Sequence, residues 1–150
     1  MSSLKANKKG NAMYHIANKS FLRAVVAAGC IALPVWAQAA GLSAINVKSA
    51  LGQPFSAEID ITGLPTEEFE FELAKGTLAS PEKYQDAKLA YPAFIRLIRV
   101  TTEKRSDGKP YLKLVSNAPI NEPALNLLVD FNWRGGRILQ KYSILLDPPK

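Results

Sequence analysis

Apolar and polar residues alternate along two neighbouring segments near the C-terminus, and this alternation limits the fold more than any other feature. The apolar positions of the first segment are Leu125, Leu127, Val129, Phe131 and Trp133. The same spacing returns over residues 138–146. Successive side chains of a strand point to opposite faces, so each segment predicts a strand with one buried and one wetter face.

Gly135 and Gly136 lie between these two segments. Glycine adopts positive φ at no steric cost, and a type I′ turn needs positive φ at both of its central residues. We therefore expect residues 125–133 to form an antiparallel hairpin with residues 137–146.

Other turn-forming residues and alternating segments predict further strands. A second glycine turn at residues 107–108 predicts a hairpin between a strand over residues 94–103 and one over residues 111–116. Nearer the N-terminus, alternation predicts a strand over residues 55–62, and the turn before it leaves a first strand over residues 44–50.

Two short segments complete the expected elements. Acidic and apolar residues alternate strictly over residues 67–73, so we expect a strand there, although the residue types also favour a helix. A serine–proline–glutamate start at residues 80–82 predicts one short helix over residues 81–89, which Pro92 ends. The sum predicts a mostly all-β fold, an immunoglobulin-like β-sandwich of about seven strands with one short helix.

The first 39 residues predict a secretory signal peptide. Five basic and no acidic residues come first, followed by an apolar run over residues 24–37 and an alanine-x-alanine site at residues 37–39. A basic region, a short apolar core and small residues at the cut are the features that define such a leader. We expect cleavage between Ala39 and Ala40, export to the periplasm, and one domain over residues 40–150.

Three alternatives to this interpretation stay open. An uncleaved membrane anchor would need about 20 apolar residues, whereas the segment 24–40 is only 17 residues long and includes Pro34. The natural start can be Met13 instead of Met1. A lipoprotein would carry its lipid on Cys30, although the apolar core continues past that residue.

Loss of the leader changes what the composition implies. The whole chain has a net charge of +6, but without the five basic residues of the leader 14 basic and 13 acidic residues remain, a net charge of +1. Such a nearly neutral domain lacks the electrostatic footprint of a nucleic-acid-binding protein, so we expect no nucleic-acid partner. His15 and Cys30, the only residues of their kinds, leave with the leader.

Residues 40–150 hold no catalytic constellation that we can identify. Without histidine or cysteine, a catalytic triad, a proton shuttle and a zinc site all lack their usual groups. The acidic run over residues 67–72 resembles calcium ligands or paired carboxylates, but we expect a hydrated strand face there, and Glu58 likewise belongs to the polar face of its strand. We expect no catalytic residue, no cofactor and no metal.

Binding residues are sought instead among loops and aromatic side chains. The loop Asn121-Glu122-Pro123 is our candidate partner-facing segment, although turn chemistry alone accounts for it. For a glycan-binding surface, the candidate aromatic residues are Tyr84, Tyr91, Tyr111 and Trp133. Trp133 continues an apolar face, which favours a place in the core.

A series of short strings along residues 41–149 resembles one known family. In chain order they are Gly41-Leu42-Ser43, residues 49–55, Ala57-Glu58-Ile59, residues 78–82, residues 107–113, Asn121-Glu122-Pro123, residues 131–137 and residues 145–149. This order is similar to that of the N-terminal periplasmic domain of the FimV family of pilus assembly proteins.

The resemblance implies a role that the residues alone do not give. Relatives are inner-membrane scaffolds of Gram-negative bacteria that support type IV pilus assembly, twitching motility and assembly of the outer-membrane secretin. Beyond this domain they carry a peptidoglycan-binding LysM module, a membrane span and a cytoplasmic repeat region, and we expect the LysM module and the membrane anchor to be absent from this chain. We therefore expect a non-enzymatic scaffold domain whose partners are proteins of the pilus and secretin machinery. A peptidoglycan-binding β-sandwich and an enzyme that uses Glu58 or residues 67–72 are the alternatives.

Overall fold

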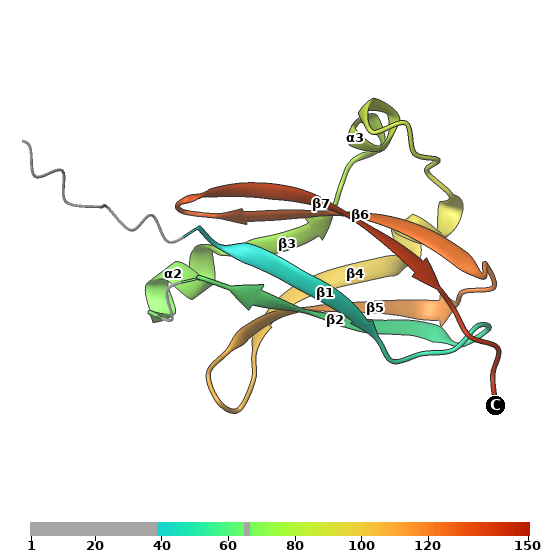
Figure 1. Ribbon diagram of the computed structural model, residues 1–150, viewed down its shortest axis with the longest axis horizontal. Helices are drawn as coiled ribbons and strands as arrows, with labels where there is room; N and C mark the ends of the chain where they lie inside the picture. The colour runs from blue at the N-terminus through green and yellow to red at the C-terminus, as the bar shows by residue number, and fades with distance from the viewer. Residues whose placement is uncertain (1–38, 65–66) are drawn as a thin grey trace, which may run out of the picture. The chain divides into compact units, whose positions relative to one another are not determined.

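Two antiparallel β-sheets pack face to face in the computed structural model, which describes residues 39–64 and 67–150 (Figure 1). The four-stranded sheet has the order β1-β2-β5-β4 and the three-stranded sheet the order β3-β6-β7. The strands are β1 (Gly41–Val47), β2 (Pro54–Thr62), β3 (Lys75–Leu78), β4 (Ile98–Lys104), β5 (Pro110–Pro119), β6 (Ala124–Trp133) and β7 (Gly136–Leu145). The predicted sandwich of about seven strands is therefore confirmed.

The core lies between the two sheets and is built from the alternating residues of the sequence. Phe55 and Ile59 of β2, and Leu127 and Phe131 of β6, are almost completely buried there. Burial of each such side chain contributes about 1.5–3 kcal/mol. Gly76 of β3 lets the sheets approach closely.

The predicted hairpin between residues 125–133 and 137–146 is confirmed, because β6 and β7 pair from Trp133↔Gly136 to Ala124↔Leu145. The reason given for its glycines is wrong, since neither Gly135 nor Gly136 lies in the left-handed region. A Cβ atom on Gly135 would lie 2.7 Å from Nε1 of Trp133, and one on Gly136 would lie 3.2 Å from Cζ2 of the same ring. The glycines therefore make room for the indole.

The strand expected over residues 67–73 is wrong. Helix α2 (Glu68–Leu73) occupies this segment, and the N–H of Phe71 donates to the carbonyl of Glu67 at 3.1 Å. The next residues, Lys75–Leu78, already form β3 and pair with β6. A strand over 67–73 would need a further neighbour to bond to, and glutamate and leucine are good helix formers. The charged residues of this run therefore do not share one sheet face.

The predicted helix start at Pro81 is confirmed, but α3 (Pro81–Asp86) ends earlier than expected. The N–H of Leu89 donates to the carbonyl of Tyr84 at 2.8 Å, and the N–H of Lys88 to the carbonyl of Gln85 at 2.9 Å. Lys88 has a φ of 56° and is therefore the left-handed residue of a Schellman cap. This cap, and not Pro92, ends the helix.

Two other expected boundaries shift. The first strand covers Gly41–Val47 and not residues 44–50. Residues 94–97, expected as strand, belong to a 3-10 helix (Ala93–Leu97), and β4 begins only at Ile98. The described chain thus contains three short helical segments where one was expected. None of the helices in the described residues is long and apolar enough to cross a membrane.

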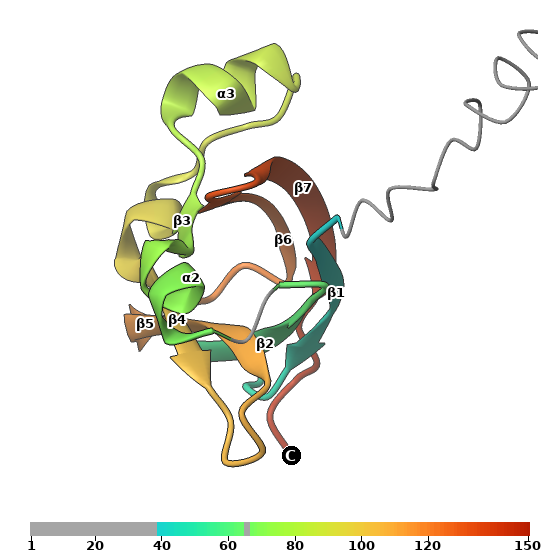
Figure 2. The same ribbon diagram turned by 90° about the vertical axis from the view of Figure 1, so that its left-hand side faces the viewer.

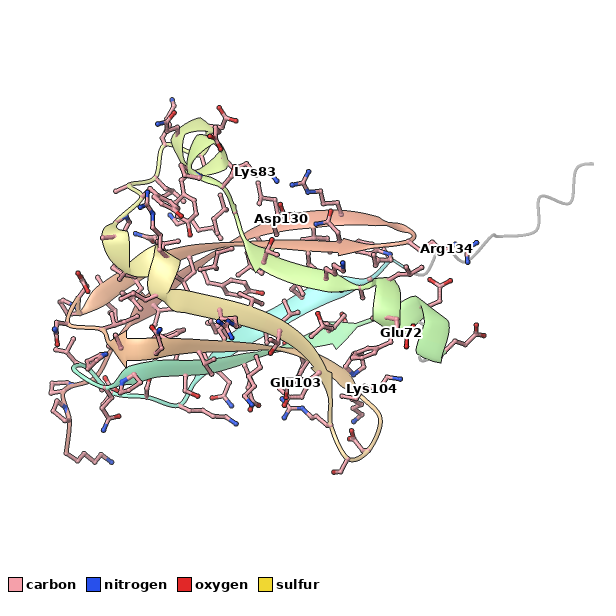
Figure 3. The ribbon with its side chains drawn as sticks, turned by 180° about the vertical axis from the view of Figure 1, so that it is seen from behind. Glu72, Lys83, Glu103, Lys104, Asp130 and Arg134 are labelled. Atoms are coloured by element: carbon pink, nitrogen blue, oxygen red, sulfur yellow. The ribbon has the colours of Figure 1, made fainter. Side chains whose placement is uncertain are left out.

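Helix α3 lies outside the three-stranded sheet, over β6 (Figures 1 and 2). Tyr84 is fully buried, and its ring meets that of Tyr91 edge-on at 5.1 Å between centroids. Lys83 forms an ion pair with Asp130 of β6, whose carboxylate also accepts two hydrogen bonds from Arg137 of β7 (Figure 3). Burial raises the pKa of the Asp130 carboxyl, and a hydrogen bond of 3.2 Å from the side-chain amide of Asn132 partly opposes this shift. The pairing therefore holds α3 against the sheet.

Candidate interaction surface

The outer face of the four-stranded sheet carries a connected group of polar side chains, which we call the polar face. Its members alternate with core residues along β2, β4 and β5, and strand pairing brings them together: Asp60 and Glu103 both lie opposite Tyr111, and Glu58 lies opposite Lys113. Its members are Glu58, Asp60, Glu103, Arg105, Tyr111 and Lys113.

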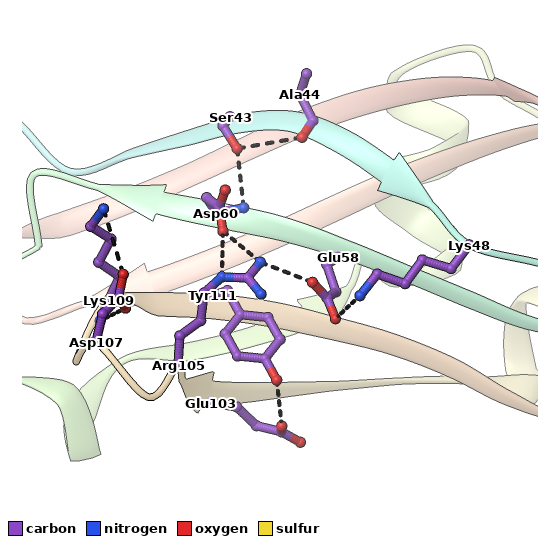
Figure 4. Close-up of polar contacts among 10 residues, drawn as sticks. All are labelled: Ser43, Ala44, Lys48, Glu58, Asp60, Glu103, Arg105, Asp107, Lys109 and Tyr111. Carbon is purple, nitrogen blue, oxygen red and sulfur yellow. Dashed lines mark hydrogen bonds and ion pairs between the residues drawn. The ribbon is translucent and has the colours of Figure 1, made fainter.

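Arg105, just after β4, is the centre of the polar face (Figure 4). Its Nη2 atom lies 2.8 Å from Oδ1 of Asp60 and 2.9 Å from Oε2 of Glu58, and its guanidinium lies 4.3 Å from the centre of the Tyr111 ring. The carboxylates of Asp60 and Glu58 raise the pKa of Arg105. The arrangement fixes a rather mobile side chain in one orientation.

Two carboxylates of this face, those of Glu58 and Glu103, are held in their ionised form. Hydrogen bonding from Lys48, assisted by Arg105, lowers the pKa of Glu58, and the hydroxyl of Tyr111 lowers the pKa of Glu103 by donating a hydrogen bond of 2.8 Å. A general acid needs the opposite shift. The polar face therefore offers charges and hydrogen bonds to a partner, and Glu58 does not have the environment of a catalytic acid.

The acidic run after β2 forms no metal site in the part of the chain that the structure describes. No group of three potential metal-ligating side chains occurs among residues 39–64 and 67–150. Glu70 is instead paired with Arg134 of the β6–β7 turn, with 3.0 Å between Oε1 and Nη1.

The candidate loop Asn121-Glu122-Pro123 is exposed at one end of the sandwich, between β5 and β6. Its backbone is tied to its neighbours, because the carbonyl of Pro123 accepts a hydrogen bond of 2.8 Å from the N–H of Leu146. The loop is thus accessible and well anchored, but the structure does not bring it together with the polar face. Its contact with a partner stays a prediction.

The predicted cleavage site lies where the described chain starts. Ala39 is exposed, Ala40 is 5% exposed and belongs to the core, and β1 begins at Gly41. The rest of the predicted signal peptide lies outside the described residues, so cleavage between Ala39 and Ala40 remains a prediction.

The four aromatic candidates for glycan binding are not gathered on one open surface. Tyr84, a residue of α3, is buried, and Tyr91 packs against it. The ring face of Tyr111 is covered by Arg105. Trp133 stacks on Phe131 with 5.5 Å between ring centroids and packs against the core, in keeping with the core position expected for it.

Sequence reasoning missed the polar face as a unit. Alternation marks Glu58, Asp60 and Tyr111 as outward-facing, but β2 and β5 are separated by some fifty residues of chain. Both the β1-β2-β5-β4 order and the register of β2 against β5 are needed to place these side chains beside each other.

Comparison with known proteins gives a consistent result. A family model described as the FimV N-terminal Ig-like domain matches residues 40–149. The chain is similar to two curated proteins, each called motility hub protein FimV, from strains PAO1 and UCBPP-PA14 of Pseudomonas aeruginosa. The identity is 34% over 135 residues in each case, which covers 87% of this chain but only 14% of each relative. No solved structure matches the chain.

Proposed function

This chain belongs to the FimV N-terminal Ig-like domain family, and we propose that it is a non-enzymatic, periplasmic interaction domain that supports type IV pilus and secretin assembly. The match to the family over residues 40–149 is the observation that carries this proposal. The relatives are named motility hub proteins, which supports a role of this domain in motility.

The polar face supports a protein partner. Its tyrosine and arginine are residue types enriched at protein interfaces, and its side chains are already fixed by hydrogen bonds. A surface ordered before binding loses little side-chain entropy when a partner docks. The pair of Arg105 with the exposed Asp60 adds little to stability, and we assign the fixed arrangement of the polar face to recognition.

Genetic deletion tests the proposal. In the bacterium that encodes this chain, we expect deletion of its coding region to reduce twitching, surface pili and secretin multimers together, and we expect expression of the chain to restore them. A deletion strain with normal twitching, pilus number and secretin multimers would contradict the proposal.

A variant of the polar face tests whether this surface binds the partner. The double variant Arg105→Gln/Tyr111→Phe removes its central charge and its hydroxyl while both core residues beside it, Leu112 and Leu114, stay in place. We expect normal amounts of exported protein with reduced motility. Unchanged motility would show that the partner docks on another surface of the domain.

A further inference from the structure

The four-stranded sheet has a second surface feature, which lies away from the polar face. A surface pocket of about 350 Å³ is lined by Arg96 and Leu97 of the 3-10 helix, Ile98 and Arg99 of β4, and Val115, Ser116 and Asn117 of β5. We call it the arginine pocket. Arg99 and Arg105 are six residues apart along an extended chain, which places the two sites roughly 20 Å apart.

The two arginines differ from the other cations of this sheet. Lys48, Arg105 and Lys113 each lie within 4.0 Å of a carboxylate, and Lys104 lies over the ring of Phe71, 4.6 Å from its centre. Arg96 and Arg99 are exposed, and among residues 39–64 and 67–150 neither forms an ion pair or a side-chain hydrogen bond. Guanidinium groups remain charged at physiological pH, so the pocket carries two uncompensated positive charges.

The floor of the pocket is rigid. The hydroxyl of Ser116 accepts a hydrogen bond of 2.7 Å from the N–H of Phe55 and donates one of 2.6 Å to the carbonyl of Ala118. Ser116 therefore has no free donor for a ligand, and its role is to fix the end of β5. The side chain of Asn117, which is exposed, remains able to donate beside the arginines.

The ligand chemistry follows from charge and from the apolar rim. Guanidinium groups bind carboxylates through two parallel hydrogen bonds, and such bonds are stronger than those between neutral groups. Leu97, at the rim, is 39% exposed, and Val115 is half-buried beside Arg99. Arginine is one of the residue types enriched at interface hot spots, and the apolar atoms of Leu97 and Val115 beside it offer surface that an apolar side chain can cover.

We infer that the arginine pocket binds a peptide segment of a protein partner in which an acidic residue stands next to an apolar one. This inference rests on the proposed interaction function and assigns it a chemical specificity. The carboxylate pairs with Arg96 and Arg99, and the apolar side chain covers Leu97.

The test uses the purified full chain and capped four-residue peptides. The probe alternates leucine and glutamate, and its control alternates leucine and glutamine. Titration followed by backbone amide shifts should show binding of the glutamate peptide at residues 97–99 and 115–117, with little response to the glutamine peptide. Inorganic phosphate serves as a third ligand, because it offers oxyanion chemistry without a peptide.

Matched variants separate the pocket from the overall charge. Arg96→Gln/Arg99→Gln removes two exposed charges, and Lys88→Gln/Lys141→Gln removes two exposed charges elsewhere. Loss of charge-assisted bonds should raise the Kd of the glutamate peptide about tenfold or more in the first variant. The lysine variant should change it by less than about twofold, as expected for distant, screened charges.

Three results would overturn the inference: equal weakening in both variants, no amide response in the pocket, or phosphate binding as tight as that of the glutamate peptide. Cell assays separate this from the proposed function. Loss of twitching on deletion, with full twitching in the Arg96→Gln/Arg99→Gln strain, would refute the pocket and keep the interaction domain. A deletion without effect would refute the interaction domain, and the peptide titration would still decide the pocket.

Discussion

The phenolic oxygen of Tyr84 accepts a hydrogen bond of 2.8 Å from the backbone N–H of Leu128. Strand β3 pairs with β6 as far as Leu78↔Val129. Just beyond that pair, the N–H of Ala79 donates a hydrogen bond to the carbonyl of Leu128. Among the described residues, no strand offers a partner to the N–H of Leu128. A side chain from α3 therefore completes the edge of the three-stranded sheet.

Replacement of Tyr84 by phenylalanine should destabilise the fold by about 1–3 kcal/mol, because it leaves a buried backbone donor without a partner. Urea unfolding of the variant and the parent chain measures this difference. Tyr91→Phe is the matched control, since Tyr91 contributes its ring to the same pair without a hydrogen bond in the described structure. Equal stability of the two variants would show that the Tyr84 hydroxyl is not needed.

Tyr142 should make the fold sensitive to alkaline pH. Its hydroxyl donates a hydrogen bond of 2.8 Å to the carbonyl of Ser43, which links β7 to β1, and burial raises the pKa of Tyr142 to about 12. A raised pKa in the folded state means that the stabilisation is complete below the unfolded value, near 10, and is lost as the pH rises through about 12.

Urea unfolding at several pH values between 9 and 12 tests this expectation. The free energy of unfolding of the parent chain should fall across this range, and Tyr142→Phe should reduce the fall. A decline of the same size in the variant would assign it to other groups.

Gly76 should be one of the least replaceable residues of β3. A Cβ atom there would lie 2.5 Å from Cδ2 of Leu112, a fully buried residue of the opposite sheet. We expect Gly76→Ala to cost about 1–3 kcal/mol through overpacking. In the double variant Gly76→Ala/Leu112→Ala, the smaller partner makes room for the new methyl group.

The cost of the double variant should therefore be smaller than the sum of the two single costs. Thermal or urea unfolding of the three variants gives the coupling directly. Strictly additive costs would mean that the two side chains do not compete for the same space.

The leader prediction has a direct test at the cut. Mass spectrometry of the exported protein should show a chain that begins at Ala40. Signal peptidase needs small residues at the positions of Ala37 and Ala39 but accepts a larger one between them. Ala39→Leu should therefore accumulate uncleaved protein, whereas Gln38→Leu should be processed normally. A mature protein that still begins at Met1 or Met13 would support the uncleaved anchor.

Local pattern was sufficient for much of the sandwich. The alternation over residues 125–133 and 55–62 identified β6 and β2 and their buried residues, because strand geometry forces every second side chain to one face. The same reasoning failed over residues 67–73. Alternation there is compatible with a strand, but a strand also needs a neighbour, and β3 already occupies the edge of β6.

The polar face could not be predicted from local pattern either, because it forms only when strands far apart in the chain pair. The sequence by itself determined the class of fold, the leader-like N-terminus and the inward or outward direction of most strand residues, since these follow from residue type and local spacing. Only the tertiary structure decided that Glu58, Arg105 and Tyr111 meet, that Arg96 and Arg99 have no carboxylate partner within the described part of the chain, and that Tyr84 completes a sheet edge. These facts depend on strand order and register, which are set by the packing of segments far apart in the chain.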